Sequence, residues 1–137
     1  PVYQAGTLSG NPVAMAAGLA QLNIITDHPE IYTVMETSAS YIANHLRASA
    51  EKHGIAMQVN QIGSLLCPYF TETPVNCYAA AKKSDTKRYA AYFNGMLKRG
   101  IYLAPSQFEA MFVSSVHTQN DLACTVQAAE ETLSEME

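Results

Sequence analysis

The chain has 137 residues, of which 48% are hydrophobic and 15% charged, and its formal net charge is −4. A chain of this length has room for one domain, or for a domain with part of a neighbour, and a fold of this size buries roughly two-thirds of its unfolded surface. A protein with this net negative charge lacks the basic surface that nucleic-acid-binding proteins have. No run of about 18 apolar residues is present. We therefore expect neither a nucleic acid nor a membrane as a partner.

The sequence contains three cysteines, Cys67, Cys77 and Cys124, and their number and spacing bear on whether the thiols are reduced. Their odd number and the lack of a C-x-x-C spacing argue against a disulfide framework and against a zinc site. No signal peptide precedes the first motif. The sequence therefore predicts reduced thiols, no metal centre and a cytoplasmic protein.

The first part of the chain predicts two helices. Asn11 can cap a helix that opens at Pro12, a position that proline favours, and that stops just before Pro29. Its small and apolar residues indicate burial on several sides. Pro29 then opens a second helix of about 24 residues, roughly 36 Å long, which ends before Gly54.

The remaining residues predict a small mixed domain. Apolar runs predict four strands, over residues 55–62, 65–70, 101–103 and 112–116. Residues 71–83 are expected to form a loop. Ser84 or Asp85 caps one helix, and Thr118 with Asp121 resembles a capping box before another. The order favours an α+β fold, with two N-terminal helices followed by a small sheet that has helices on one face.

A glycine-rich turn precedes the first helix, with the sequence Gly6-Thr7-Leu8-Ser9-Gly10-Asn11-Pro12. Glycines let a backbone approach a ligand, and Thr7 and Ser9 add hydroxyl groups. The unpaired N–H groups of a helix N-terminus favour anions such as phosphate. The spacing lacks the G-K-[S/T] of a P-loop, so these residues alone favour a plain capping loop over a phosphate site.

The second motif, residues 100–110, contains a single carboxylate. Glu109 lies between Phe108 and Ala110, so we expect it to be partly buried, and a buried carboxylate needs a partner. That partner can be a backbone donor or an arginine, or the carboxylate can act in a site. His117 is open to the same two interpretations, and a structural role is favoured for it.

Taken as whole strings, the two motifs resemble one enzyme family. Y-Q-A-G-T-L-S-G-N-P followed by A-M-A-A-G, together with A-P-S-Q-F-E-A, is similar to the glutamate-1-semialdehyde 2,1-aminomutases. These enzymes form a branch of the class III aminotransferases, among the fold type I pyridoxal-phosphate enzymes. The resemblance is strongest over residues 1–18 and 100–118, and it corresponds to the C-terminal third of a full aminomutase.

The resemblance implies roles for individual residues. In the family, the threonine of the glycine-rich turn contacts the cofactor phosphate of the neighbouring subunit in a homodimer, which assigns Thr7, with Gly6 beside it, to cofactor binding. Glu109 becomes an auxiliary catalytic residue that orients groups around the substrate or cofactor. Met111 stands where the family usually has glycine, a departure that bears on the local backbone conformation.

The resemblance also implies an activity and a domain division. The family converts glutamate-1-semialdehyde, a small-molecule substrate, to 5-aminolevulinate for tetrapyrrole (porphyrin) synthesis, and cycles pyridoxal 5′-phosphate with its pyridoxamine form. Residues 1–28 would end the large cofactor-binding domain, 29–54 would form a long connecting helix, and 55–137 would form the C-terminal small domain. None of the five lysines matches the family's Schiff-base lysine, so the chain alone is expected to be inactive.

Two alternatives remain open. One is another class III aminotransferase, which transfers an amino group between two substrates. The other is a stand-alone dimerisation or binding module, in which the two N-terminal helices would be partner surfaces.

Overall fold

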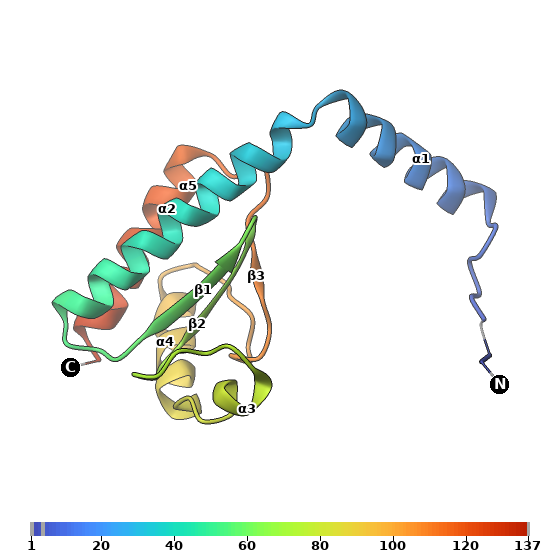
Figure 1. Cartoon of the computed structure of the whole chain (residues 1–137). Helices are drawn as coiled ribbons and strands as arrows, with labels where there is room; N and C mark the ends of the chain where they lie inside the picture. Colours follow the sequence, from blue (N-terminus) through green and yellow to red (C-terminus); the bar gives the residue numbers. More distant parts are fainter. Residues whose placement is uncertain (1, 4, 137) are drawn as a thin grey trace. The chain divides into compact units, whose positions relative to one another are not determined.

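The chain divides into two compact units, residues 1–31 and 32–137, in a computed structural model that describes residues 2–3 and 5–136. Pro1 and Gln4, which belong to the first motif, lie outside the described residues. The elements follow in the order α1, α2, β1, β2, α3, α4, β3 and α5 (Figure 1). The domain boundaries predicted at residues 28 and 54 from the family resemblance stay predictions.

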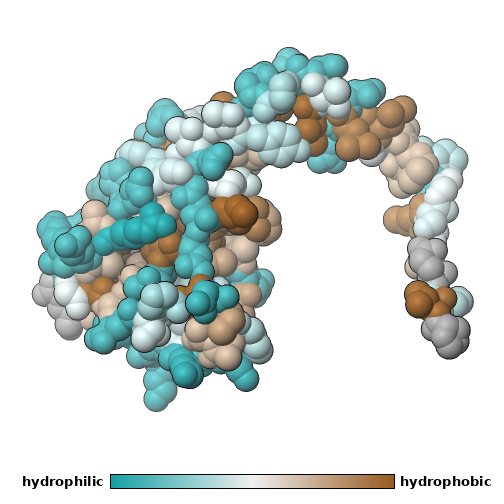
Figure 2. All heavy atoms as spheres, in the orientation of Figure 1, coloured by the Kyte–Doolittle hydropathy of each residue, from teal (hydrophilic) through white to brown (hydrophobic). Residues whose placement is uncertain are grey.

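Helix α1, Pro12–Asp27, begins behind Asn11 as predicted. It carries no buried residue, and its apolar side chains, such as Leu19 and Leu22 at 61% and 63% exposure, lie at the surface (Figure 2). The described residues of the first unit therefore do not provide the burial that the composition of α1 predicts. Neither α1 nor another helix of the described residues combines the length and apolarity that a bilayer crossing requires.

The end of helix α2, Glu30–Lys52, explains where the first strand begins. Gly54 has a φ of +63°, and the Ile55 amide donates to the Ala50 carbonyl at 2.8 Å. This is a Schellman ending, in which the apolar residue after the glycine packs back on the helix. Strand β1, Gln58–Ile62, therefore begins three residues later than predicted.

The same kind of ending removes a predicted strand. Helix α4, Thr86–Lys98, is followed by Gly100 with a φ of +80°, and the Ile101 amide donates to the Met96 carbonyl at 3.0 Å. Residues 101–103 have no strand partner within the described residues. The strand prediction was wrong because the apolar residue that completes the helix cap was taken as the start of a strand.

A three-stranded antiparallel sheet remains, in the order β1-β2-β3. Strand β2 is Leu65–Tyr69, and β3 is only Met111–Phe112. The strand predicted over 112–116 ends at Phe112, because the Ser114 amide donates to His117 Nδ1 at 2.9 Å and turns the chain away from the sheet.

Buried side chains of three helices and the sheet form one core. Helix α5, Gln119–Ser134, opens on the predicted capping box of Thr118 and Asp121. The predicted loop over 71–83 contains one additional short helix, α3, Tyr78–Ala81. The predicted α+β class is confirmed. The largest fully buried apolar side chains of the core are Leu46, Leu66, Tyr92, Met96 and Leu133.

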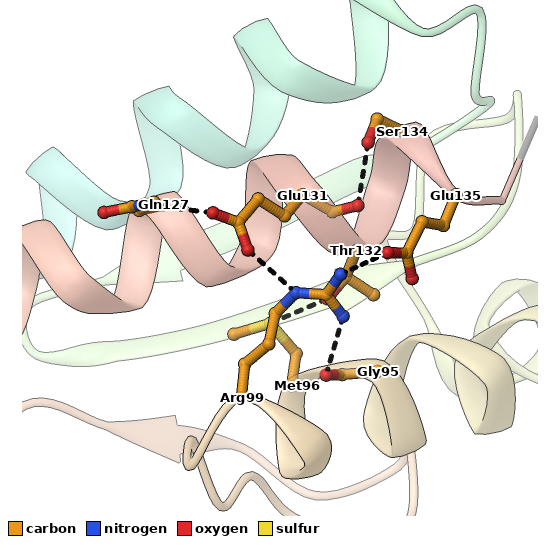
Figure 3. Close-up of polar contacts among 8 residues, drawn as sticks. All are labelled: Gly95, Met96, Arg99, Gln127, Glu131, Thr132, Ser134 and Glu135. Carbon is orange, nitrogen blue, oxygen red and sulfur yellow. Dashed lines mark hydrogen bonds and ion pairs between the residues drawn. The ribbon is translucent and has the colours of Figure 1, made fainter.

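The contact between α4 and α5 depends on a glycine. A Cβ added at Gly95 would lie 2.4 Å from Thr132 Cγ2, so the two helices approach too closely for a side chain there. Arg99 joins the same helices, because its Nε donates to Glu131 at 3.0 Å and its Nη2 to Glu135 at 2.5 Å (Figure 3). A packing contact and a surface ion pair therefore reinforce each other.

We expect Gly95→Ala to destabilise the second unit, because the methyl group forces α4 and α5 apart. Overpacking of this kind costs roughly 1–3 kcal/mol. Urea unfolding followed by circular dichroism measures the change. Gly18→Ala is the matched control, since that helical glycine has nothing within 4 Å of an added Cβ. Equal losses in the two variants would contradict the packing argument.

A single carboxylate links the end of α2 to α5. Glu130 accepts hydrogen bonds from Lys52 Nζ at 2.5 Å and from the Ser49 hydroxyl, and it lies 2.9 Å from His53 Nε2. These contacts, led by Lys52, lower the pKa of Glu130 from 4.5 to about 2. Because the folded-state pKa lies below the ordinary value, the ionised carboxylate stabilises the fold above pH 4.5. That stabilisation is lost as the pH falls toward 2.

Replacing Glu130 with glutamine should therefore have a pH-dependent effect on stability. At pH 7 we expect Glu130→Gln to lower the free energy of unfolding by about 1 kcal/mol, a value that allows for solvent screening of a partly exposed group. The difference between the two proteins should shrink as the pH falls from 4.5 toward 2. Urea titrations across that range measure it, and a difference independent of pH would count against the ionic link.

Candidate functional site

The glycine-rich turn before α1 leaves several donors free. The Ser9 amide donates to the Gly6 carbonyl at 3.1 Å and the Asn11 amide to the Leu8 carbonyl at 3.0 Å, which gives two overlapping turns. Backbone amides and hydroxyl groups that have no other partner can bind an oxyanion such as phosphate. The donors of the turn without a hydrogen bond in the described residues are the amides of Gly6, Thr7, Leu8 and Gly10 and the hydroxyls of Thr7 and Ser9.

The start of helix α1 offers no such donors, contrary to the prediction. Asn11 Oδ1 accepts from the amides of Val13 at 3.0 Å and Ala14 at 3.1 Å, and the Asn11 carbonyl accepts from Met15 at 2.9 Å. Pro12 has no N–H group. An anion bound here has to use the turn before Asn11, while the partial positive charge of the helix still adds attraction.

Two glycines shape this turn for different reasons. A Cβ added at Gly6 would lie 2.3 Å from Ser9 Oγ, so the chain folds closely over that residue. Gly10 has a φ of +75°, a left-handed conformation that glycine adopts without strain. The turn therefore takes its shape from its own residues.

The turn that carries Glu109 exposes this residue, which was expected to be partly buried. The Glu109 amide donates to the Ser106 carbonyl at 3.1 Å. This turn buries Gln107, at 3% exposure, and leaves Phe108 and Glu109 exposed. The prediction of a partly buried Glu109 was wrong, because the chain reverses here and places its neighbour inside. The Glu109 carboxylate makes no hydrogen bond within the described residues and is accessible to a ligand.

A cavity of about 500 Å³ in the second unit has Glu109 among its lining residues. A cavity of this kind can hold a small organic group next to a carboxylate. The nitrogen of His117 that accepts from Ser114 holds a turn, in line with the structural role favoured for it. The apolar lining residues include Leu46, Leu66, Met96 and Leu122, and the lining also contains the imidazole of His117 and the carboxyl group of Asp121.

Met111 changes the cavity and leaves the backbone ordinary. It lies in β3, paired with Leu66. No non-glycine residue among those described has a positive φ. The conformation at this position therefore does not require glycine, and the Met111 side chain lines the cavity instead.

The other ionisable groups of the described residues do not form a metal-binding cluster. Within residues 2–3 and 5–136, no three His, Cys, Asp or Glu side chains are grouped so that they could hold a metal ion. Of the lysines, Lys52 pairs with Glu130, and the Lys82 ammonium lies 5.3 Å from the centre of the Tyr78 ring.

Comparison with known proteins decides the family. Over 134 residues the chain is 58% identical to glutamate-1-semialdehyde 2,1-aminomutase of Ruminiclostridium cellulolyticum, and the match covers 98% of the chain. The chain is homologous to the C-terminal portion of the glutamate-1-semialdehyde 2,1-aminomutases. The family member of Deinococcus radiodurans is 51% identical over 132 residues, which cover 94% of the chain. The chain spans 31% and 30% of the lengths of these two relatives, and no family model matches it.

Solved structures of class III aminotransferases share the fold. A β-phenylalanine aminotransferase from Variovorax paradoxus matches with a TM-score of 0.84 and 26% identity, over 98% of this chain and 31% of its own. A glutamate-1-semialdehyde-aminomutase from Pseudomonas aeruginosa matches with a TM-score of 0.71 and 18% identity, over 79% of this chain and 24% of its own. The predicted resemblance to the C-terminal portion of an aminomutase is thereby confirmed. The roles of Gly6, Thr7 and Glu109 stay predictions.

The capping and ligand-binding parts of the first motif should separate by mutation. Asn11→Ala removes the acceptor of two amides and should destabilise α1 by about 1 kcal/mol, which lowers helicity because no residue of α1 is buried in this chain. Thr7→Ala, in contrast, should leave the circular dichroism at 222 nm unchanged. A similar loss of helicity in both variants would contradict the separation.

Proposed function

We propose that this chain is the phosphate-contacting and C-terminal portion of a cytoplasmic, pyridoxal-phosphate-dependent aminomutase that converts glutamate-1-semialdehyde to 5-aminolevulinate for tetrapyrrole synthesis. The observation that carries the proposal is the 58% identity, over 98% of the chain, to a protein of that name. When bound, pyridoxal phosphate supplies the electron sink and the carrier of the amino group.

The donors of the first motif fit the phosphate of that cofactor. The Thr7 hydroxyl and the amides around Gly6 have no other partner in the described residues, and an anionic ester needs several such donors together. Among the structural neighbours, one is a transaminase with PLP bound and another is an aminomutase variant in complex with PMP. These neighbours support a phosphate-bearing cofactor in both of its forms for the present chain.

Two further parts of the proposal concern what surrounds the chain. We place the Schiff-base lysine outside these 137 residues, so the chain alone is inactive. We also propose a homodimer in which Thr7 contacts the cofactor of the neighbouring subunit. The exposed apolar side chains of α1 fit a helix that is covered in the whole enzyme.

Glu109 is proposed to orient the reacting groups. Its exposed carboxylate can accept hydrogen bonds from an amino group, and it borders a cavity with apolar walls. A fixed acceptor of this kind holds an amine in one orientation while the surrounding apolar residues exclude water.

Another class III aminotransferase is the second possible function. The Variovorax paradoxus enzyme has the same fold and a different activity, since it is a β-phenylalanine aminotransferase. Its 26% identity is well below the 58% of the aminomutase relative, which favours the aminomutase.

The direct test places this chain in an intact enzyme. In a chimera, residues 1–137 replace the homologous segment of the Ruminiclostridium cellulolyticum relative, and formation of 5-aminolevulinate from glutamate-1-semialdehyde is measured. We expect turnover. A folded chimera without turnover would contradict the proposal, and amino transfer between two separate substrates would favour the second function.

In the same chimera, Thr7→Ala should weaken retention of the cofactor at least about tenfold, because a charge-assisted hydrogen bond to the phosphate is lost. Visible absorbance after dialysis measures retention. Thr26→Ala is the matched control, since that hydroxyl of the same unit is already bonded to the Leu22 carbonyl at 2.8 Å. Unchanged retention in Thr7→Ala would remove Thr7 from the phosphate site.

A further inference from the structure

The segment that presents Glu109, residues 104–110, is held at both ends from the protein interior, and we call it the Glu109 turn. At its start, the Tyr89 hydroxyl of α4 donates to the Ala104 carbonyl at 2.7 Å. At its end, the Cys67 thiol of β2 donates to the carbonyl of Glu109 at 3.7 Å, a long and weak contact of the kind that sulfur makes. The position of the turn is therefore set by one core side chain, Tyr89, and by the partly exposed Cys67 of β2.

Gln107 is buried in the middle of the Glu109 turn, although its side chain adds little to the free energy of unfolding. Its side chain is 3% exposed, and its Nε2 reaches the Ser84 carbonyl only at 3.5 Å. Its Oε1 is buried and has no partner in the described residues, and the same is true of Ser84 Oγ. A buried amide paired this poorly stabilises a fold less than an apolar side chain of similar size does. Stability alone does not explain a glutamine here.

The Tyr89 hydroxyl is a hydrogen-bond donor that stays protonated over a wide pH range. Its ring is 3% exposed and lies 6.4 Å from the ring of Tyr92, centre to centre. Burial, followed by the proximity of Cys67 and Glu109, raises the pKa of Tyr89 to about 12. The hydroxyl therefore keeps its proton and its bond to Ala104 across the pH range in which enzymes work.

We infer that Tyr89 and Gln107 are positioning residues, which fix the Glu109 turn so that its exposed carboxylate stays in one place beside the cavity. The inference rests on the proposed function, in which Glu109 orients the reacting groups. An exposed carboxylate on an unsupported turn would sample many positions, and displacements of about 1 Å at a reacting centre already lower rates. The two buried side chains remove that freedom from the backbone beneath Glu109.

A double-mutant cycle in the active chimera tests whether Tyr89 acts through Glu109. Tyr89→Phe keeps the ring and should lower kcat about three- to tenfold, the scale set by one lost hydrogen bond, with a smaller change in KM. Glu109→Gln should lower kcat more. In the Glu109→Gln background, Tyr89→Phe should have no further effect. An equal Tyr89→Phe effect in both backgrounds would overturn the inference.

Gln107→Met separates positioning from simple stabilisation. We expect the melting temperature to stay the same or rise, because an unpaired buried amide is removed, while kcat falls. A residue with only a structural role would lose stability and activity together, and that outcome, or a stable variant with full activity, would overturn the assignment of Gln107. Tyr41→Phe is the matched control for Tyr89→Phe, since this tyrosine of α2 is partly buried against the same core, does not line the cavity, and its hydroxyl makes no hydrogen bond within the described residues.

Amide hydrogen exchange gives a readout that does not depend on activity. Tyr89→Phe should speed exchange of the Glu109 amide, which is bonded to the Ser106 carbonyl, and Tyr41→Phe should not. Unchanged exchange in Tyr89→Phe, with lower turnover in Glu109→Gln, would overturn the inference alone. Unchanged turnover in Glu109→Gln would overturn both the inference and the proposed role of Glu109.

Discussion

Helices α4 and α5 can lie as close together as they do only because Gly95 has no side chain. Arg99 completes the contact at the surface by reaching two carboxylates of α5 (Figure 3). This packing fixes α4 against the core and thereby fixes the buried ring of Tyr89. Since the Tyr89 hydroxyl holds the Ala104 carbonyl, the position of the turn that carries Glu109 follows from it. A steric constraint between two helices thus determines where an exposed carboxylate lies.

The two units bring different chemistry to the proposed enzyme. The first unit offers neutral donors, the amides and hydroxyl of the turn around Thr7, and these suit an anion. Asn11 occupies the helix amides, so capping the helix and binding a phosphate use separate groups. The second unit offers one carboxylate, Glu109, beside an apolar cavity, and this suits an amine.

Signals confined to a few residues were predictable from the sequence. Asn11 and Thr118 cap helices as expected, and of the two candidates Ser84 and Asp85 it is Asp85 that caps α4, because a cap depends on amides within three residues of it. The strand predicted over 101–103 failed because a Schellman ending uses the same glycine and apolar residue. The orientation of the Glu109 turn was also not predictable, since it depends on contacts with α4 and β2, which are distant in sequence. For the glycine-rich turn, residue chemistry alone favoured a cap, and only the family resemblance indicated a phosphate contact.

In the proposed enzyme, the turn before α1 receives the phosphate of the cofactor. The most direct measurement is a crystal structure of the chimera with pyridoxal phosphate bound. We expect phosphate oxygens at roughly 2.7–3.2 Å from the Thr7 hydroxyl and from amides of the turn, with Asn11 still capping α1. A phosphate held entirely by other groups, with Thr7 directed into solvent, would contradict it.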